Sequence, residues 1–153
     1  MSVLDAILRV CVLRPDVVDA PNYASEGAAG LDLQAAIPEP RCLARGEVLR
    51  IPTGVAVELP ARHEGQVRPR SGLAARHGVT LLNAPGTIDA DYRGEICVLL
   101  INLGQEDYVV NPGDRIAQLV VAPVIHARIE VVSVLSALSS TKRGEDGFGS
   151  TGR

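Results

Sequence analysis

Two aspartates and a tyrosine stand close together near the middle of the chain. Asp89 and Asp91 are two residues apart, Tyr92 follows at once, and turn signals at Pro85-Gly86 and Arg93-Gly94 bracket the stretch. This spacing predicts a β-hairpin with the acids at its tip. In a strand the two acids would share one face and the ring would point away from it. Because folding does not require two carboxylates and a ring at a turn, this stretch is a candidate ligand site.

Two further polar residues stand in apolar surroundings. Asp32 lies within the apolar stretch 30–35. It either makes a local turn hydrogen bond, the simpler interpretation for the isolated residue, or reaches a water on Mg²⁺, an ion that proteins bind with few carboxylates and substrate phosphates. Gln118 is either a hydrogen-bonded core amide or a ligand contact, and the sequence leaves both open.

The histidines show no metal-ligand spacing and are expected to be structural or at the surface: His63, His77 and His126.

A candidate anion site precedes the best helix candidate of the chain, residues 71–78. Arg68 and Arg70 flank Pro69, Ser71 is expected to be the N-cap, and Gly78 can end the helix. Free N–H groups at a helix start and a nearby arginine favour phosphate. The alternative is an ordinary serine cap with solvated arginines. We favour phosphate binding, because the proline fixes the turn between the two arginines.

The end of the chain, from residue 138, is rich in Ser, Thr and Gly, which is typical of a tail. Residues 143–153 form a second phosphate-like element, in which small residues let backbone amides approach an anion. It lacks the Gly-Lys-Ser/Thr of a Walker A motif. The alternative is a disordered tail. However, Phe148 is the only phenylalanine of the chain and stands between two glycines, which suggests a ring that closes over a flat ligand.

Length and composition exclude several classes. The 153 residues suit one domain, and 46% hydrophobic with 22% charged residues is typical of a globular protein. A net charge of −3 without a basic cluster argues against nucleic-acid binding. Three cysteines without paired spacing indicate a reducing cytoplasm rather than disulfides or zinc. No signal peptide or membrane-spanning apolar run is apparent, so an intracellular protein is expected.

Many short strands with regular turn signals and one short helix predict an all-β sandwich or barrel, without a repeat or a second domain. The stretch 96–102 is apolar on both faces, so a second sheet or a neighbouring subunit should cover each face. The expected strands are 7–13, 31–35, 48–52, 54–59, 66–68, 96–102, 115–123 and 126–132.

Five segments, in order, resemble the motifs of the trimeric dUTP diphosphatase (dUTPase) family. These segments are 29–35, 68–78, 83–96, 113–119 and 143–152. Together they span nearly the whole chain, and five ordered motifs are far more specific than one. The chain departs from the family at Asp146, where members commonly carry glycine, so a carboxylate lies beside the phosphate loop of the tail.

The resemblance implies a jelly-roll-like β-barrel over residues 1–137 and a flexible, glycine-rich tail over residues 138–153. It also implies a homotrimer with three active sites, each built from all three subunits, with the tail closing over a neighbour's site. The implied activity is Mg²⁺-assisted attack of water on the α-phosphorus of dUTP, giving dUMP and pyrophosphate. That reaction keeps uracil out of DNA and supplies dUMP for thymidylate synthesis.

The resemblance also implies roles for individual residues. Asp89 is the base that deprotonates the attacking water, and Asp32 contacts the magnesium through a water while the phosphates bind the ion. The residues implied in phosphate binding are Arg70, Ser71, Gly72 and Gln118, with Arg143, Gly149, Ser150 and Thr151 of the tail.

Base and sugar selection are implied for the central segment. Tyr92 would pack under the sugar and exclude a 2′-hydroxyl, and Phe148 would stack on the base. The residues implied at the uracil edge are Asn83 and the backbone of Gly86, Thr87 and Ile88.

Two other functions fit the same scaffold. A dCTP deaminase-like enzyme shares the fold, but its reaction takes place at the base and uses a glutamate for it, whereas this chain carries Asp89 and Tyr92. A non-catalytic nucleotide-binding regulator should have lost Asp89 or the tail motif, and neither is lost.

Overall fold

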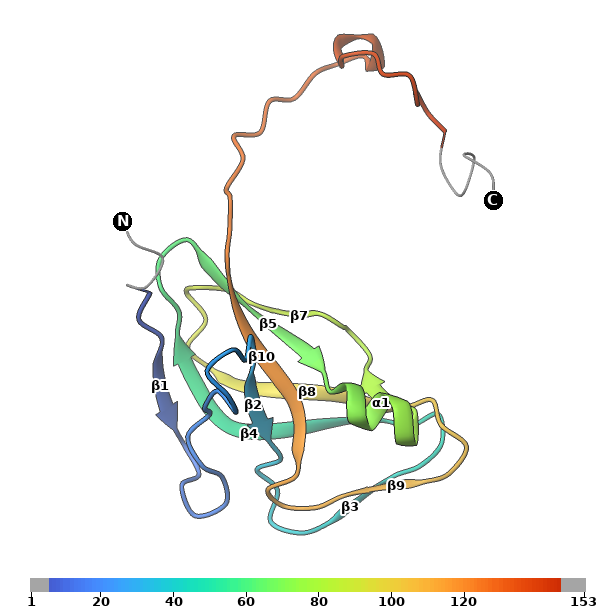
Figure 1. The fold of residues 1–153 in the computed structure, drawn as a ribbon. Coiled ribbons are helices and arrows are strands. Elements are labelled where there is room, and N and C mark those ends of the chain that lie inside the picture. The colour runs from blue at the N-terminus through green and yellow to red at the C-terminus, as the bar shows by residue number, and fades with distance from the viewer. Residues whose placement is uncertain (1–5, 147–153) are drawn as a thin grey trace.

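The computed structural model describes residues 6–146 and has an all-β architecture with one short α-helix (Figure 1). Two four-stranded antiparallel sheets, β1-β4-β8-β6 and β2-β10-β5-β7, enclose the core, and β3 pairs with β9 beside them. The elements are β1 (Arg9–Val12), β2 (Leu31–Gln34), β3 (Arg41–Leu43), β4 (Val48–Glu58), β5 (His63–Pro69), α1 (Ser71–His77), β6 (Val79–Leu81), β7 (Gly86–Ile88), β8 (Glu95–Asn102), β9 (Tyr108–Val110) and β10 (Arg115–Pro123).

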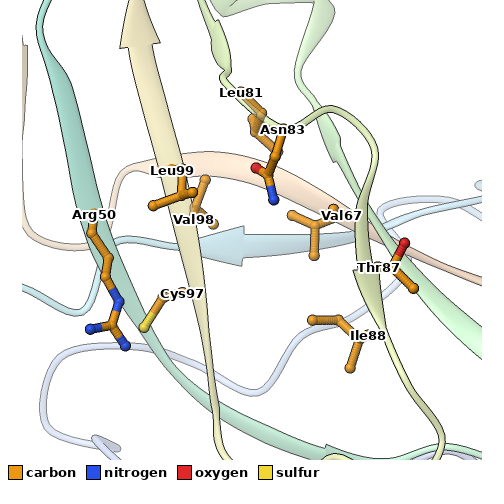
Figure 2. A pocket seen from close by; sticks show the side chains of 10 residues that line it. Arg50, Val67, Leu81, Asn83, Thr87, Ile88, Cys97, Val98 and Leu99 are labelled. Carbon is orange, nitrogen blue, oxygen red and sulfur yellow. The ribbon is translucent and has the colours of Figure 1, made fainter.

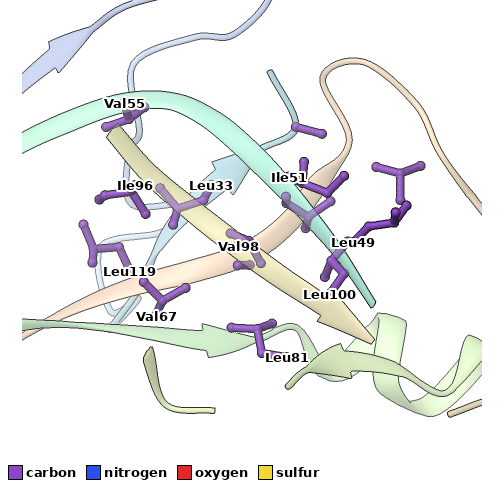
Figure 3. Packing of buried hydrophobic residues seen from close by; sticks show 14 of the residues in the cluster. Leu33, Leu49, Ile51, Val55, Val67, Leu81, Ile96, Val98, Leu100 and Leu119 are labelled. Carbon is purple, nitrogen blue, oxygen red and sulfur yellow. The ribbon is translucent and has the colours of Figure 1, made fainter. Parts of the chain in front are cut away.

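The core lies between the inner faces of the two sheets and consists of aliphatic side chains (Figure 3). Leu33 of one sheet and Ile51 and Ile96 of the other are fully buried. The alternation of side chains along each strand places these residues inward and the polar residues outward. The predicted all-β class is therefore confirmed, with Val, Leu and Ile filling a core that contains no Phe or Trp.

Strand β8 runs through the centre of its sheet, and its burial alternates along its length. Ile96, Val98 and Leu100 are buried, whereas Cys97 and Leu99 on the other face are only half-buried. Within this single chain the second sheet covers one face of β8 and leaves the other partly open. Cover of the second face by a neighbouring subunit remains a proposal.

Strand β4 is continuous, so the prediction of two strands, 48–52 and 54–59, is wrong. The pairing of β4 with β8 shifts register between Pro52 and Ala56. Gly54 has φ of +67° in this irregularity, and its N–H donates to Oε1 of Glu95 across 2.8 Å. Thr53 is buried and its hydroxyl donates to the carbonyl of Ile96 across 2.7 Å. These bonds hold the strand together where the proline interrupts the ladder, so the strand bends instead of ending.

The predicted β-hairpin over residues 82–95 is also wrong. The chain leaves the β1-β4-β8-β6 sheet after β6, and β7 then pairs with β5 of the other sheet. Strand β8 returns to the first sheet beside β4. The stretch with Asp89 and Asp91 is therefore a crossing between sheets rather than the tip of a hairpin.

Helix α1 occurs where it is expected, but Arg70 is the N-cap and Ser71 is already the first helical residue, without a side-chain capping bond. Gly78 ends the helix at φ of +66°. A Cβ on Gly78 would lie 2.5 Å from Cα of Gly104, and the carbonyl of Gly78 accepts from Leu103 N across 2.9 Å. This close contact fixes the helix against the loop that follows β8.

The predicted strand 126–132 is wrong, because these residues are neither helical nor paired in this chain. After β10 ends at Pro123, the chain runs away from the sheets (Figure 1) and makes a single 3₁₀ turn at Leu135–Ala137. Apolar side chains on this segment are exposed, with Ile129 86% and Val131 89% accessible. Among the described residues, no helix is long and apolar enough to cross a bilayer.

Candidate active site

A charged cluster forms where β2 and β10 pair on the outer face of their sheet. Asp32 lies directly opposite Gln118, which donates from Nε2 to Oδ1 of Asp32 across 3.4 Å. Arg70 Nε lies 3.2 Å from Oδ1 and Arg115 Nη1 lies 3.2 Å from Oδ2 of the same carboxylate, whose side chain is 14% exposed. Asp32 therefore pairs with residues far along the chain, and the alternative of a local turn bond is wrong.

The turn before β10 determines how this cluster is built. In the turn over residues 111–114, Gly113 has φ of +79° and the Asp114 carboxylate accepts from Asn111 N across 2.7 Å. Its backbone bonds to the end of β2, where Ala35 N donates to Asp114 O across 2.8 Å. A register shift between Arg115 and Ala117 then brings Gln118 opposite Asp32.

Arg70 is held between the cluster and the helix. Its Nη1 donates to the carbonyl of Arg115 across 3.1 Å, in addition to the ion pair with Asp32. Ser71 is exposed at the first position of α1, and Gly72 lies under the side chain of Arg76, where a Cβ would come within 3.0 Å of the guanidinium. The structure thus brings Arg70, Asp32 and Gln118 together, with the first turn of α1 beside them.

Four of the residues expected at the base line another cavity, of about 240 Å³. Figure 2 shows Asn83, Val67 and Ile88 on one side of β8 and Arg50 on the other, with Cys97 on β8 itself. Gly86 is buried against Val67, and a Cβ there would lie 3.3 Å from the valine Cβ. A small cavity with an apolar wall and a few polar groups is a typical binding site for a small ring. The residues expected at the base that line it are Asn83, Gly86, Thr87 and Ile88.

Asp89 is exposed and lines a different hollow, of about 640 Å³, to which His63, Asp91 and His126 also contribute. Thr87 lines both this hollow and the smaller cavity.

The third histidine, His77, lies away from this hollow. Its ring centroid is 4.9 Å from that of Tyr108, and burial raises the pKa of the Tyr108 phenol.

Tyr92 is held by its own loop. Its hydroxyl donates to the carbonyl of Glu95 across 2.9 Å, and its N–H donates to Asp89 O across 3.1 Å. The ring lies directly over Gly94, where a Cβ would approach the ring carbon Cζ to 2.6 Å. Because glycine has no Cβ, it is the only residue at position 94 that leaves room for the ring in this position.

The described part of the tail contains one of the predicted phosphate ligands, Arg143. Its Nε donates to the carbonyl of Asp146 across 2.7 Å, and Gly144 N donates to Oγ1 of Thr141 across 3.1 Å. The remaining predicted tail residues lie outside the described residues: Phe148, Gly149, Ser150 and Thr151.

The donor set constrains how magnesium could bind. Within residues 6–146, no three histidine, cysteine or acidic side chains lie close enough together to hold a metal ion. Both oxygens of Asp32 already face arginines. A single carboxylate in that setting fits a contact to a water of a phosphate-bound Mg²⁺ and does not fit a metal site made by protein alone.

Apart from Asp89, Tyr92 and the tail residues, the candidate residues fall into two groups in one chain. The first surrounds Asp32 and the second surrounds Asn83. Asp32 and Arg115 of the first group line a hollow that is separate from the cavity lined by the second group. Sequence reasoning assigned no role to Arg115, which pairs with Asp32 at 55% side-chain exposure. Its position in the same motif as Gln118 was the available signal, but only the register shift shows that both reach Asp32.

Comparison with known proteins identifies the family of the chain. The dUTPase family model matches residues 16–152. The chain is 58% identical over 136 residues to the deoxyuridine 5′-triphosphate nucleotidohydrolase of Anaeromyxobacter sp., covering 89% of each chain. It is 51% identical over 135 residues to the enzyme of the same name from Chlamydia felis, covering 88% of this chain and 92% of the relative.

A solved structure is similar in fold. The dUTPase of Staphylococcus bacteriophage 80alpha, determined with dUpNHpp, superposes with a TM-score of 0.81 at 27% identity, covering 96% of this chain and 99% of the phage chain. The family model spans most of the chain, and the two bacterial relatives are 58% and 51% identical to it. The chain belongs to the dUTPase family.

Proposed function

We propose that this protein hydrolyses dUTP to dUMP and pyrophosphate. The observation that carries the proposal is the 58% identity, over 89% of the chain, to a relative named deoxyuridine 5′-triphosphate nucleotidohydrolase. The predicted hydrolase function agrees with the names of both bacterial relatives. In a cell the reaction would keep uracil out of DNA and supply dUMP for thymidylate synthesis.

Asp89 is proposed as the general base that takes a proton from the water attacking the α-phosphorus. Its exposed carboxylate lies in the crossing between β7 and β8, next to the hollow that Thr87 shares with the smaller cavity. A positioned base contributes roughly 10²–10⁴-fold to a rate. The family resemblance, rather than the geometry of this chain alone, supports the choice of Asp89 over Asp91.

The cluster around Asp32 is proposed to hold the triphosphate. Arg70 and Gln118 offer donors to phosphate oxygens, with Ser71 and Gly72 beside them at the start of α1. Magnesium bound to the phosphates would neutralise charge on the leaving pyrophosphate, with Asp32 holding one of its waters. Because Asp32 pairs with Arg70 in the free protein, the guanidinium must exchange this carboxylate for phosphate when the nucleotide binds.

The cavity lined by Asn83 is proposed as the uracil site. An amide side chain and the backbone of Gly86, Thr87 and Ile88 can match the donor and acceptor pattern of uracil and leave groups of cytosine unpaired. Tyr92, fixed over Gly94, is proposed to pack under the deoxyribose and exclude a 2′-hydroxyl.

We further propose a homotrimer in which each active site combines residues of different subunits. The separation of the Asp32 group from the Asn83 group in one chain supports it, as does the half-open second face of β8. The tail, with Arg143, Phe148, Gly149, Ser150 and Thr151, is proposed to close over a neighbour's site. A cytoplasmic location is proposed from the free cysteines Cys11, Cys42 and Cys97.

Product identification tests the function against the deaminase alternative. The protein is incubated with Mg²⁺ and either dUTP or dCTP, and the nucleotides are separated by chromatography. We expect dUMP from dUTP and unchanged dCTP. Formation of dUTP from dCTP would contradict the proposal in favour of a deaminase, and no turnover of either nucleotide would favour a non-catalytic regulator.

A further inference from the structure

Arg68 stands in the same row of side chains as Asp32 and Gln118. It flanks Pro69 in the predicted anion site, but the proposed function assigns it no phosphate contact. The register of β10 places Gln118 opposite Asp32 of β2 on one side and opposite Arg68 of β5 on the other. Residues directly opposite one another in antiparallel strands point to the same face of the sheet, with Cβ atoms about 4.5–5.5 Å apart. Asp32, Gln118 and Arg68 therefore form one continuous row across three strands.

This outer face carries more positive than negative charge near the row. Arg70 and Arg115 both face the single carboxylate of Asp32, and Arg68 adds a third guanidinium. Glu64 lies on the same face of β5 as Gln66, and its Oε1 accepts from Gln66 Nε2 across 2.8 Å, so Gln66 lies between Glu64 and Arg68. The face thus favours a polyanion over a neutral ligand.

The guanidinium of Arg68 is held but not neutralised. Its Nε donates to Oε1 of Gln66 across 3.0 Å, and its Nη2 donates to the same oxygen. Among the ion pairs of residues 6–146, none involves Arg68. Since hydrogen bonds between charged partners are stronger than those to a neutral amide, exchange of the Gln66 oxygen for a phosphate oxygen is favourable.

We propose that Arg68 is a further substrate-binding residue, which extends the phosphate site from Gln118 along β5 and binds the terminal phosphates of the nucleotide. The inference rests on the proposed function and adds to it. Arg70 must leave an ion pair to bind phosphate, whereas Arg68 leaves only a bond to an amide. Arg68 is also exposed, so substitution there leaves the core untouched.

Binding of two nucleotides tests the inference. We measure the Kd of the non-hydrolysable α,β-imido analogue of dUTP and of dUMP, with Mg²⁺, for the whole protein and for Arg68→Gln. Loss of a charged hydrogen bond should weaken the imido analogue roughly tenfold. Binding of dUMP, which lacks the terminal phosphates, should change less than about twofold on the same reasoning.

Two variants control for charge and for packing. Arg41→Gln removes the same charge from exposed β3, which pairs with β9 and not with β2, β5 or β10, and should bind like the unchanged protein. Arg68→Lys keeps the charge and should lose less affinity than Arg68→Gln.

Four results would overturn the inference: unchanged affinity in Arg68→Gln, equal losses in Arg68→Gln and Arg41→Gln, equal losses for the analogue and dUMP, or equal losses in the Lys and Gln variants. The first of these leaves the proposed function intact if the unchanged protein binds the analogue. Failure of the unchanged protein to bind it contradicts the proposed function itself.

Discussion

At the scale of single residues, the position of Tyr92 depends on the neighbouring Gly94. The phenol bonds to Glu95 O, and the ring occupies the space that a side chain at Gly94 would need. The sequence showed the glycine only as a turn signal. Its packing role could not be predicted, because it depends on the loop folding the ring back over position 94.

Substitution of that glycine should loosen the sugar selection. In Gly94→Ala the new methyl group collides with the ring and displaces it, so the site should accept a 2′-hydroxyl more readily. We expect the ratio of kcat/KM for dUTP to that for UTP to fall roughly tenfold, about the effect of one lost steric contact. An unchanged ratio, with the Tyr92→Ala ratio reduced, would show that the ring does not need Gly94.

The role of Asp89 is tested by an isosteric change. Asp89→Asn keeps the shape of an exposed side chain but removes the base, so kcat should fall roughly 10²–10⁴-fold while the imido analogue of dUTP still binds. Asp91→Asn is the matched control and should retain most activity. Near-normal kcat in Asp89→Asn, or an equal fall in Asp91→Asn, would contradict the assignment.

At the scale of elements, alternation of side chains and turn residues predicted the fold class, helix α1 and β10 well. Both signals depend on residues that are close together in the sequence. The errors concern partners. Turn signals around Asn83–Gly94 show where the chain bends, but not that β7 joins β5 in the other sheet. Residues 126–132 alternate like a strand, but a strand needs a partner, and none of residues 6–146 pairs with them.

The junction of α1 and the loop after β8 should be sensitive to a single methyl group. Gly78→Ala places Cβ 2.5 Å from Gly104 Cα, in addition to the cost of φ of +66°. We expect the free energy of unfolding, measured with urea, to fall by about 3 kcal/mol or more.

Gly46→Ala separates the two costs. Gly46 has φ of +76°, but no atom lies within 4 Å of its Cβ position. Its loss of stability should be about 1–2 kcal/mol, from backbone conformation alone. Equal losses in the two variants would show that the contact between Gly78 and Gly104 contributes nothing.

At the scale of the whole molecule, the two groups of site residues explain what one sequence could and could not predict. The motifs identified Asp32, Asn83 and Gln118 as candidates because each motif is local. The structure joins Asp32, Arg70, Arg115 and Gln118, but places the Asn83 group at another hollow. No pattern within one chain reveals which residues of separate copies meet, so the shared site remains a proposal.

Mixed trimers test that proposal. Asp32→Ala and Asp89→Asn are expected to be nearly inactive alone. If the two residues of one site come from different subunits, co-expression in equal amounts should restore about one quarter of the activity, since each site receives both intact residues by chance in one case in four. If both residues come from the same subunit, every site lacks one of them, and activity should stay at the level of the separate variants.

The central claim is that the chain hydrolyses dUTP selectively. The most direct test is release of pyrophosphate by the purified protein with Mg²⁺ from dUTP, dTTP, dCTP and UTP, measured separately. A site that hydrogen-bonds the uracil edge should favour dUTP over dCTP by roughly 10⁴-fold in kcat/KM. Steric exclusion of the 5-methyl group of dTTP and of the 2′-hydroxyl of UTP should also disfavour these two nucleotides strongly. Similar release from all four nucleotides, or none from dUTP, would contradict the account.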